Sequence, residues 1–288
     1  MAVSGSKKPL RELSISQQSS FAWPPFQGEW WAFACEGMLN KTPAAFHLIV
    51  FRFRDRERLP LCLQKLVFPE VNGTLVSLYL VDRKYYVFEQ SNVGNIFSSS
   101  GSHFQFGSWE GNEHYIYCTK EDIELTFSLV PEKNPISLPK PPWSSGVFYP
   151  RVNVTGTIRS ANELGVFRGK GCYEIGSSDT MPRNLASLHC NWVYILFDDR
   201  SEVIMWQVGE DFYGMYVYTD GTAVPLEDRA LSWTPMRYWK SARTGVLYPI
   251  EWQFAFKSSG IHVEVKAFFP TQEVNACKLF SGRMWLGL

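Results

Sequence analysis

The sequence lacks long apolar runs and an excess of charge of either sign. No stretch approaches the roughly 18–20 consecutive apolar residues that a membrane-spanning helix needs, so we expect no membrane span. The 28 basic and 28 acidic residues leave a formal net charge of zero, and no basic stripe is present. A nucleic-acid partner is therefore not expected. Residues 1–20 have no apolar segment typical of a secretory signal, which predicts a flexible polar leader and a cytoplasmic protein.

Sequence signatures of common catalytic and metal sites are missing too. The chain has no GxSxG, P-loop, GxGxxG or HExxH segment, which argues against a catalytic triad and against nucleotide or zinc chemistry. Its six cysteines form no CxxC pair and show no metal-ligand spacing with the five histidines. We therefore expect no cofactor and no metal, and we interpret the cysteines as buried reduced thiols.

Apolar and aromatic residues are abundant instead. They account for 45% and 16% of the chain, against 19% charged residues, as in a globular protein. Segments in which apolar and polar residues alternate with a period of two recur along the sequence. No amphipathic helix longer than about three turns is found. Residues 45–54 (AFHLIVFRFR) begin apolar on both faces, which predicts a strand covered on both sides. The pattern predicts an all-β fold of two antiparallel sandwich or barrel-like domains packed together.

A proline-rich segment divides the strand pattern. Residues 131–142 (PEKNPISLPKPP) contain five prolines, which cannot donate to a strand ladder and therefore indicate a connector. We predict a flexible leader at 1–20, an N-terminal β-domain at 21–135 and a C-terminal β-domain at 143–288.

Two carboxylates stand out as candidate acids. Glu29 precedes two adjacent tryptophans, Trp30 and Trp31, whose side chains point to opposite faces of a strand. Glu29 is either a partly buried proton-transfer group or a solvated neighbour of a structural tryptophan pair. Glu174 ends the glycine-rich segment 169–174 on the same face as Cys172, and is either a pocket acid or an exposed residue at a strand end.

A second group of candidates lies on neighbouring predicted strands of the C-terminal half. Asn191 and Trp192 belong to one strand and Trp206 to the next, so their side chains could form one pocket wall. Strict alternation puts Asn191 and Trp192 on opposite faces of their strand, so at most one of them faces a ligand unless a bulge intervenes.

In this order the segments resemble the lipocalin-like superfamily of hydroxyneurosporene synthases (carotenoid hydratases) and AttH-type proteins, which includes Diels–Alder cyclases of polyketide biosynthesis. Glu29-Trp30-Trp31 resembles the family's opening motif, residues 45–54 its second strand and residues 149–156 (YPRVNVTG) its entry to the second domain. Asn191-Trp192 and residues 205–208 resemble its two tryptophan-bearing strands. Where the family has Asp-His-x-Trp-Gly, this chain keeps a carboxylate at Glu174 but lacks the His and the Trp.

The resemblance implies a cofactor-free enzyme with a hydrophobic polyene substrate. Because the His and Trp of the family box are missing, we predict an intramolecular [4+2] cycloaddition of a polyketide-type polyene, which needs mainly a shaped pocket. The alternatives are a hydratase or hydrolase that uses the glutamates as acid and base, and a non-catalytic carrier of an apolar ligand. The predicted catalytic residues are Glu29, Glu174, Tyr149 and Asn191, and the predicted substrate-binding residues are Trp31, His47, Phe51, Trp192 and Trp206.

Overall fold

The regular structure of this chain consists of strands. The computed structural model describes residues 28–53, 61–68, 73–80, 96–99, 102–109, 113–120, 123–137, 144–160, 163–178, 190–209, 211–226, 231–256, 260–267, 270, 273–274 and 284–285. Every element within these ranges is a β-strand, and every pairing between them is antiparallel. The predicted all-β class is confirmed.

The largest sheet, called the large sheet below, has 11 strands. Ten follow the order β4-β3-β2-β1-β11-β10-β8-β7-β6-β5, and β9 pairs with β10. Its strands are β1 (Gly28–Leu39), β2 (Thr42–Phe53), β3 (Leu61–Phe68), β4 (Gly73–Leu80), β5 (Ile96–Ser99), β6 (Ser102–Trp109), β7 (Glu113–Lys120), β8 (Ile123–Pro131), β9 (Ile136–Ser137), β10 (Ser144–Ser160) and β11 (Glu163–Ser178). Because β10 pairs with β8 and β11 pairs with β1, this sheet joins strands from both sides of the proline-rich segment. The predicted division at 135–143 stays a prediction.

Three smaller sheets follow in the sequence. The middle sheet has the order β12-β13-β14-β15 and the outer sheet the order β16-β17-β18, while β19 pairs with β20. Their strands are β12 (Cys190–Leu196), β13 (Glu202–Val208), β14 (Asp211–Val217), β15 (Ala223–Pro225), β16 (Leu231–Lys240), β17 (Leu247–Phe256), β18 (Ile261–Lys266), β19 (Glu273–Val274) and β20 (Met284–Trp285).

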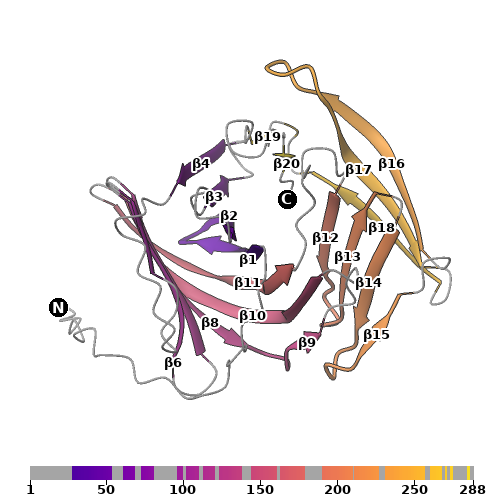
Figure 1. Ribbon diagram of the computed structural model, residues 1–288, viewed down its shortest axis with the longest axis horizontal. Helices are drawn as coiled ribbons and strands as arrows, with labels where there is room; N and C mark the ends of the chain where they lie inside the picture. Colours follow the sequence, from indigo (N-terminus) through magenta and orange to yellow (C-terminus); the bar gives the residue numbers. More distant parts are fainter. Residues whose placement is uncertain are drawn as a thin grey trace.

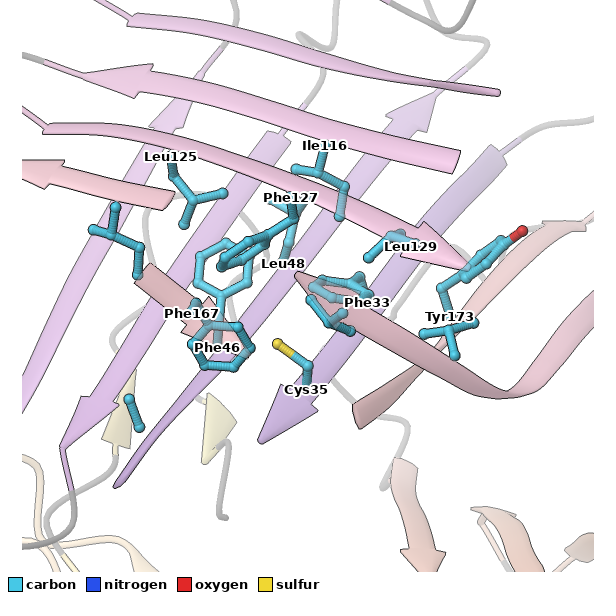
Figure 2. Close-up of a cluster of buried hydrophobic side chains, with 14 residues drawn as sticks. Phe33, Cys35, Phe46, Leu48, Ile116, Leu125, Phe127, Leu129, Phe167 and Tyr173 are labelled. Atoms are coloured by element: carbon cyan, nitrogen blue, oxygen red, sulfur yellow. The ribbon is translucent and has the colours of Figure 1, made fainter. Parts of the chain in front are cut away.

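The large sheet is strongly curled around an apolar core. Its strands β2 and β8 are four positions apart in the sheet order, which would separate them by about 19 Å in a flat sheet. The rings of Phe46 on β2 and Phe127 on β8 nevertheless lie 5.2 Å apart, centroid to centroid. Figure 2 shows the side chains of this core pointing toward one another from strands on opposite sides. We call this inner side of the sheet the concave face.

Glycines allow the strands to bend and approach closely where β1 meets β11. Gly37 on β1 lies opposite Gly169 on β11, so neither strand carries a side chain at this pair. A Cβ on Gly37 would lie 2.2 Å from the carbonyl oxygen of Arg168, too close for any larger residue. The small residues therefore favour the tight curvature that closes the concave face over its core.

The middle sheet packs on the convex face of the large sheet, and the outer sheet packs on the middle sheet. Phe148 of β10 packs edge-on against Tyr194 of β12, with ring centroids 5.4 Å apart. On the far side of the middle sheet, Val203 and Met205 form a second core with Phe254 of the outer sheet. The middle sheet thus lies between the large and outer sheets, as Figure 1 shows.

A buried ion cluster fastens the middle sheet to the large sheet. The Glu202 carboxylate on β13 accepts hydrogen bonds from the Arg151 Nε of β10 and, at 2.7 Å, from the Lys133 Nζ. The three side chains are at most 3% exposed. Arg151 and Lys133 also donate to the main-chain carbonyls of Phe197, at 3.0 Å, and Tyr218, at 2.7 Å, so two turns of the middle sheet are bound to the same cations.

We expect Glu202→Gln to lower the free energy of unfolding by about 3–5 kcal/mol, because it leaves two buried cations without their countercharge. Urea unfolding followed by fluorescence measures this loss. The matched control is Glu132→Gln, which removes an ion pair whose cation, Arg200, is 57% exposed, and we expect it to cost about 1 kcal/mol or less. Equal losses for the two variants would contradict a special role of the buried cluster.

Candidate functional site

The candidate site is the aromatic layer between the convex face of the large sheet and the middle sheet. Its fully buried members come from both sheets, and partly buried rings surround them. The layer contains Phe148, Cys172, Ile204 and Met215, with Ala34, Ile136, Trp192, Tyr194, Trp206 and Ala223 packed against them. We call it the inter-sheet layer.

Glu174 is the buried carboxylate of this region. It follows Cys172 by two residues on β11, with no irregularity between them, so both side chains lie on the convex face. Its cross-strand neighbour on β10 is Phe148. The side chain of Glu174 is only 3% exposed, so the interpretation of an exposed strand-end residue is wrong.

The indole of Trp30 holds the Glu174 carboxylate. Its Nε1–H donates a hydrogen bond of 2.9 Å to Glu174 Oε1. The ring lies over Gly176, where a Cβ would meet the indole atoms Cε2 and Cζ2 at 2.2 and 2.3 Å. Glycine at position 176 is therefore what allows the ring to reach the acid.

Burial disfavours the reactive thiolate form of the Cys172 thiol, which lies beside Glu174. Burial and, second, the nearby Glu174 carboxylate raise the pKa of the Cys172 thiol well above its ordinary value. The thiol consequently stays protonated at neutral pH, and nucleophilic attack requires the thiolate. Among the described residues of this layer, Glu174 is thus the group suited to proton transfer.

Two tryptophans cover the layer from the middle sheet. Trp192 on β12 lies directly opposite Trp206 on β13, and both pack against the inter-sheet layer. The buried Nε1–H of Trp192 has no hydrogen-bond acceptor within the described part of the chain. A buried donor without an acceptor costs free energy, and a ligand oxygen would satisfy it.

Tyr149 and Asn191 lie on other faces. Tyr149 stacks on Tyr173 in the concave face, with centroids 4.0 Å apart, whereas the preceding residue, Phe148, faces the inter-sheet layer. Asn191 precedes Trp192 and donates a 2.9 Å hydrogen bond from Nδ2 to Gln207 Oε1. Alternation puts this pair on the face of the middle sheet that looks toward the outer sheet. The structure therefore does not gather the predicted catalytic residues at one place.

The remaining predicted residues lie on β1 and β2. His47 is buried and sits opposite Ala34, on the convex face two strands from Cys172. In the strand register Trp31 pairs with Val50, and Glu29 and Phe51 are also part of the strands, but the side chains of these three predicted residues lie outside the described part of the structure.

A histidine that the sequence did not point to lies in the concave face. The ring of His114 on β7 is 5.2 Å from that of Tyr149 and 5.0 Å from that of Tyr173. Burial lowers the pKa of His114 from 6.5 to about 4, so the ring is neutral at pH 7. Tyr173 lies at one end of the concave core (Figure 2), and burial raises its pKa.

The described ranges contain neither a candidate metal site nor a membrane-spanning helix. No group of three or more His, Cys, Asp or Glu side chains there is arranged to hold a metal ion. No helix there is long and apolar enough to cross a bilayer.

Comparisons with known proteins agree with this architecture. The model of a family described as AttH-like matches residues 143–287. An AttH protein from Nitrosomonas europaea has a TM-score of 0.80 and 19% identity, over 95% of this chain and 91% of that chain. Kievitone hydratase from Nectria haematococca has a TM-score of 0.65 and 13% identity, over 92% and 84%. CghA with Sch210972 has a TM-score of 0.53 and 9% identity, over 84% and 76%.

At these identities the three solved structures share the fold with this chain. The predicted fold class is therefore confirmed, but within the described residues the sheets do not close into a barrel. No curated protein sequence matches the chain significantly.

We expect Gly176→Ala to push the Trp30 indole away from Glu174, since the added Cβ would overlap the ring. The lost hydrogen bond should cost roughly 1–3 kcal/mol of stability. The ¹H–¹⁵N resonance of the Trp30 indole, assigned with Trp30→Phe, should shift. Ser177→Ala, at the adjacent position, is the matched control and should leave the resonance in place. An unmoved Trp30 signal in Gly176→Ala would contradict this packing.

The depressed pKa of His114 predicts a pH-dependent stability. The unfolded chain binds a proton at this residue near pH 6.5 and the folded chain only near pH 4, so its contribution is present above pH 6.5 and is lost as the pH falls toward 4. Between pH 7 and pH 4, wild type should lose about 3 kcal/mol more unfolding free energy than His114→Phe. His262→Phe, which replaces an exposed ring, should keep the wild-type slope. Parallel curves for wild type and His114→Phe would reject the assignment.

Proposed function

This chain belongs to the AttH-like family, and on that premise we propose that it is an enzyme that binds a hydrophobic, unsaturated small molecule in the inter-sheet layer. The proposed reaction is a cofactor-free intramolecular [4+2] cycloaddition. The observation that carries the proposal is the buried indole N–H of Trp192, a donor with no acceptor within the described residues, surrounded by aromatic side chains.

The chemistry needs little from the protein beyond shape and one hydrogen bond. In a [4+2] closure two carbon–carbon σ bonds form, three π bonds are consumed and one new π bond appears, with no proton or electron exchanged with the enzyme. Aromatic walls would hold diene and dienophile together, which removes part of the entropic barrier. The Trp192 N–H would donate to a carbonyl conjugated with the dienophile, stabilising the charge that develops there.

The buried position of Glu174 supports a second candidate reaction, the hydration of an alkene. A carboxyl group in an apolar layer, held by the Trp30 N–H, could donate a proton to one alkene carbon. Water would then add to the other carbon, and its released proton would return to Glu174. Kievitone hydratase, which shares the fold, is named as a hydratase. CghA also shares the fold, and its structure contains the small molecule Sch210972. Both likenesses support a small-molecule substrate.

Two single substitutions distinguish the candidates, tested on a linear polyene with a conjugated carbonyl. If the protein is a cyclase, Trp192→Phe should lower turnover roughly tenfold to a hundredfold, because one transition-state hydrogen bond is lost. Trp206→Phe is the matched control, since it removes an indole from the facing position whose N–H has no proposed role. Glu174→Gln should remain active, and the pH–rate profile should be flat.

Product mass gives the independent readout. Cyclisation leaves the mass of the substrate unchanged, whereas hydration adds one water. Loss of activity in Glu174→Gln by roughly 10²-fold or more, with a product heavier by one water, would overturn the cyclase in favour of the hydratase. Recovery of chemically unaltered ligand from a stable complex would overturn both and identify a carrier.

A further inference from the structure

The β16–β17 hairpin extends beyond the sheet to which it belongs. The third strand, β18, pairs with β17 only over Glu251–Phe256, so the distal part of the hairpin is a two-stranded ribbon. Figure 1 shows this part reaching past the neighbouring strands of the middle sheet. We call residues 236–249 the hairpin ribbon.

The hairpin ribbon exposes large apolar side chains close together. Met236, Tyr238 and Leu247 are 59%, 53% and 61% exposed. Tyr238 pairs with Pro249 and Lys240 with Leu247, so Tyr238 and Leu247 are diagonal neighbours on one face. Single exposed apolar residues are ordinary, but a group on a projecting hairpin indicates an interaction surface.

The opposite face of the ribbon keeps it rigid. Trp239 stacks on Tyr248 across the two strands, with ring centroids 6.1 Å apart and an interplanar angle of 24°. Tyr248 is only 7% exposed. The apolar face is thus displayed on a packed support, so binding would cost little conformational entropy.

The charge of the hairpin ribbon has one sign. Residues 236–249 contain three basic and no acidic residues, in a chain whose net charge is zero. Arg237 forms an ion pair with Glu251 at 2.7 Å. Lys240 and Arg243 are exposed on the ribbon and its turn. Apolar side chains flanked by Lys and Arg, with Trp and Tyr beside them, match the interface of an anionic bilayer.

We propose that the hairpin ribbon docks this protein onto the surface of an anionic lipid bilayer. Met236, Tyr238 and Leu247 insert among the lipid headgroups, while Lys240 and Arg243 contact lipid phosphates. This goes beyond the proposed reaction and does not depend on it. It would bring the enzyme to the phase in which an apolar substrate accumulates.

The test uses the full-length protein and flotation with vesicles of phosphatidylcholine, with or without phosphatidylglycerol. Binding should be at least about tenfold stronger to the anionic vesicles and should weaken as salt is raised. The double variant Tyr238→Ser/Leu247→Ser should lower binding about tenfold or more, because inserted apolar area is lost. Lys240→Glu should lower it about tenfold through charge alone.

Leu164→Ser is the matched control, because Leu164 is a 54% exposed leucine on β11, outside the hairpin ribbon. It should change vesicle binding by less than about twofold. Absence of vesicle binding, equal binding to neutral and anionic vesicles, or unaltered binding of the double variant would each overturn the proposal.

Sedimentation velocity adds one more outcome. A wild-type dimer that the double variant dissociates, with no vesicle binding, would identify a second copy as the occupant and overturn it as well. These readouts involve no turnover, so they fail or succeed independently of the proposed reaction.

Discussion

The arrangement of the site depends on the ion pairs that the buried Glu202 carboxylate forms with Arg151 and Lys133. The carboxylate reaches Arg151 because of a bulge in β10. Tyr149 pairs with Tyr173 and Val152 with Gly171, so β10 has one residue more than β11 there, and both Tyr149 and Val152 face the concave core. The extra residue lets Arg151 point to the convex side. Without the extra residue, alternation would put Arg151 and Tyr149 on the same face. The middle sheet would then lose the ion pair between Arg151 and Glu202 that joins it to the large sheet.

Consecutive side chains of strand β11 lie in two separate environments, one on each face of the large sheet. Tyr173 belongs to the concave core and Glu174, one residue later, to the convex face. Only the second environment combines a buried carboxylate, indole N–H groups and rings from two sheets. Because such a layer excludes water, each hydrogen bond made to a ligand there is worth more than it would be in solvent. The site is therefore a product of sheet stacking rather than of the interior of one sheet.

Local alternation predicted much of the fold, and its failures have local causes. Residues 44–48 are buried on both faces of β2, as the apolar pattern of 45–54 indicated. Alternation over residues 115–119 and 123–130 likewise predicts a hairpin, which the structure forms as β7 and β8. Strand β16 was missed, because Pro235 and two register shifts near Arg237 break its alternation. Alternation also predicts a hairpin of residues 74–81 and 84–90, and its second strand lies outside the described residues. For the site, the sequence identified Glu174 and Trp192 as candidates. It could not decide that Glu174 is buried, since the ring that holds its carboxylate, Trp30, is 144 residues away in the sequence.

The pairing of β1 with β11 has a consequence for the chain while the ribosome is still synthesising it. Trp30 and Glu174, which meet across these strands, are 144 residues apart in the sequence. A ribosome adding roughly 5–20 residues per second needs roughly 7–30 s to make that stretch. During this interval the edge of β1 that later receives β11 has no partner, and an unpaired strand edge with apolar neighbours invites association with other chains. The fold that builds the inter-sheet layer thus leaves this edge of the nascent chain open to association until β11 has been made.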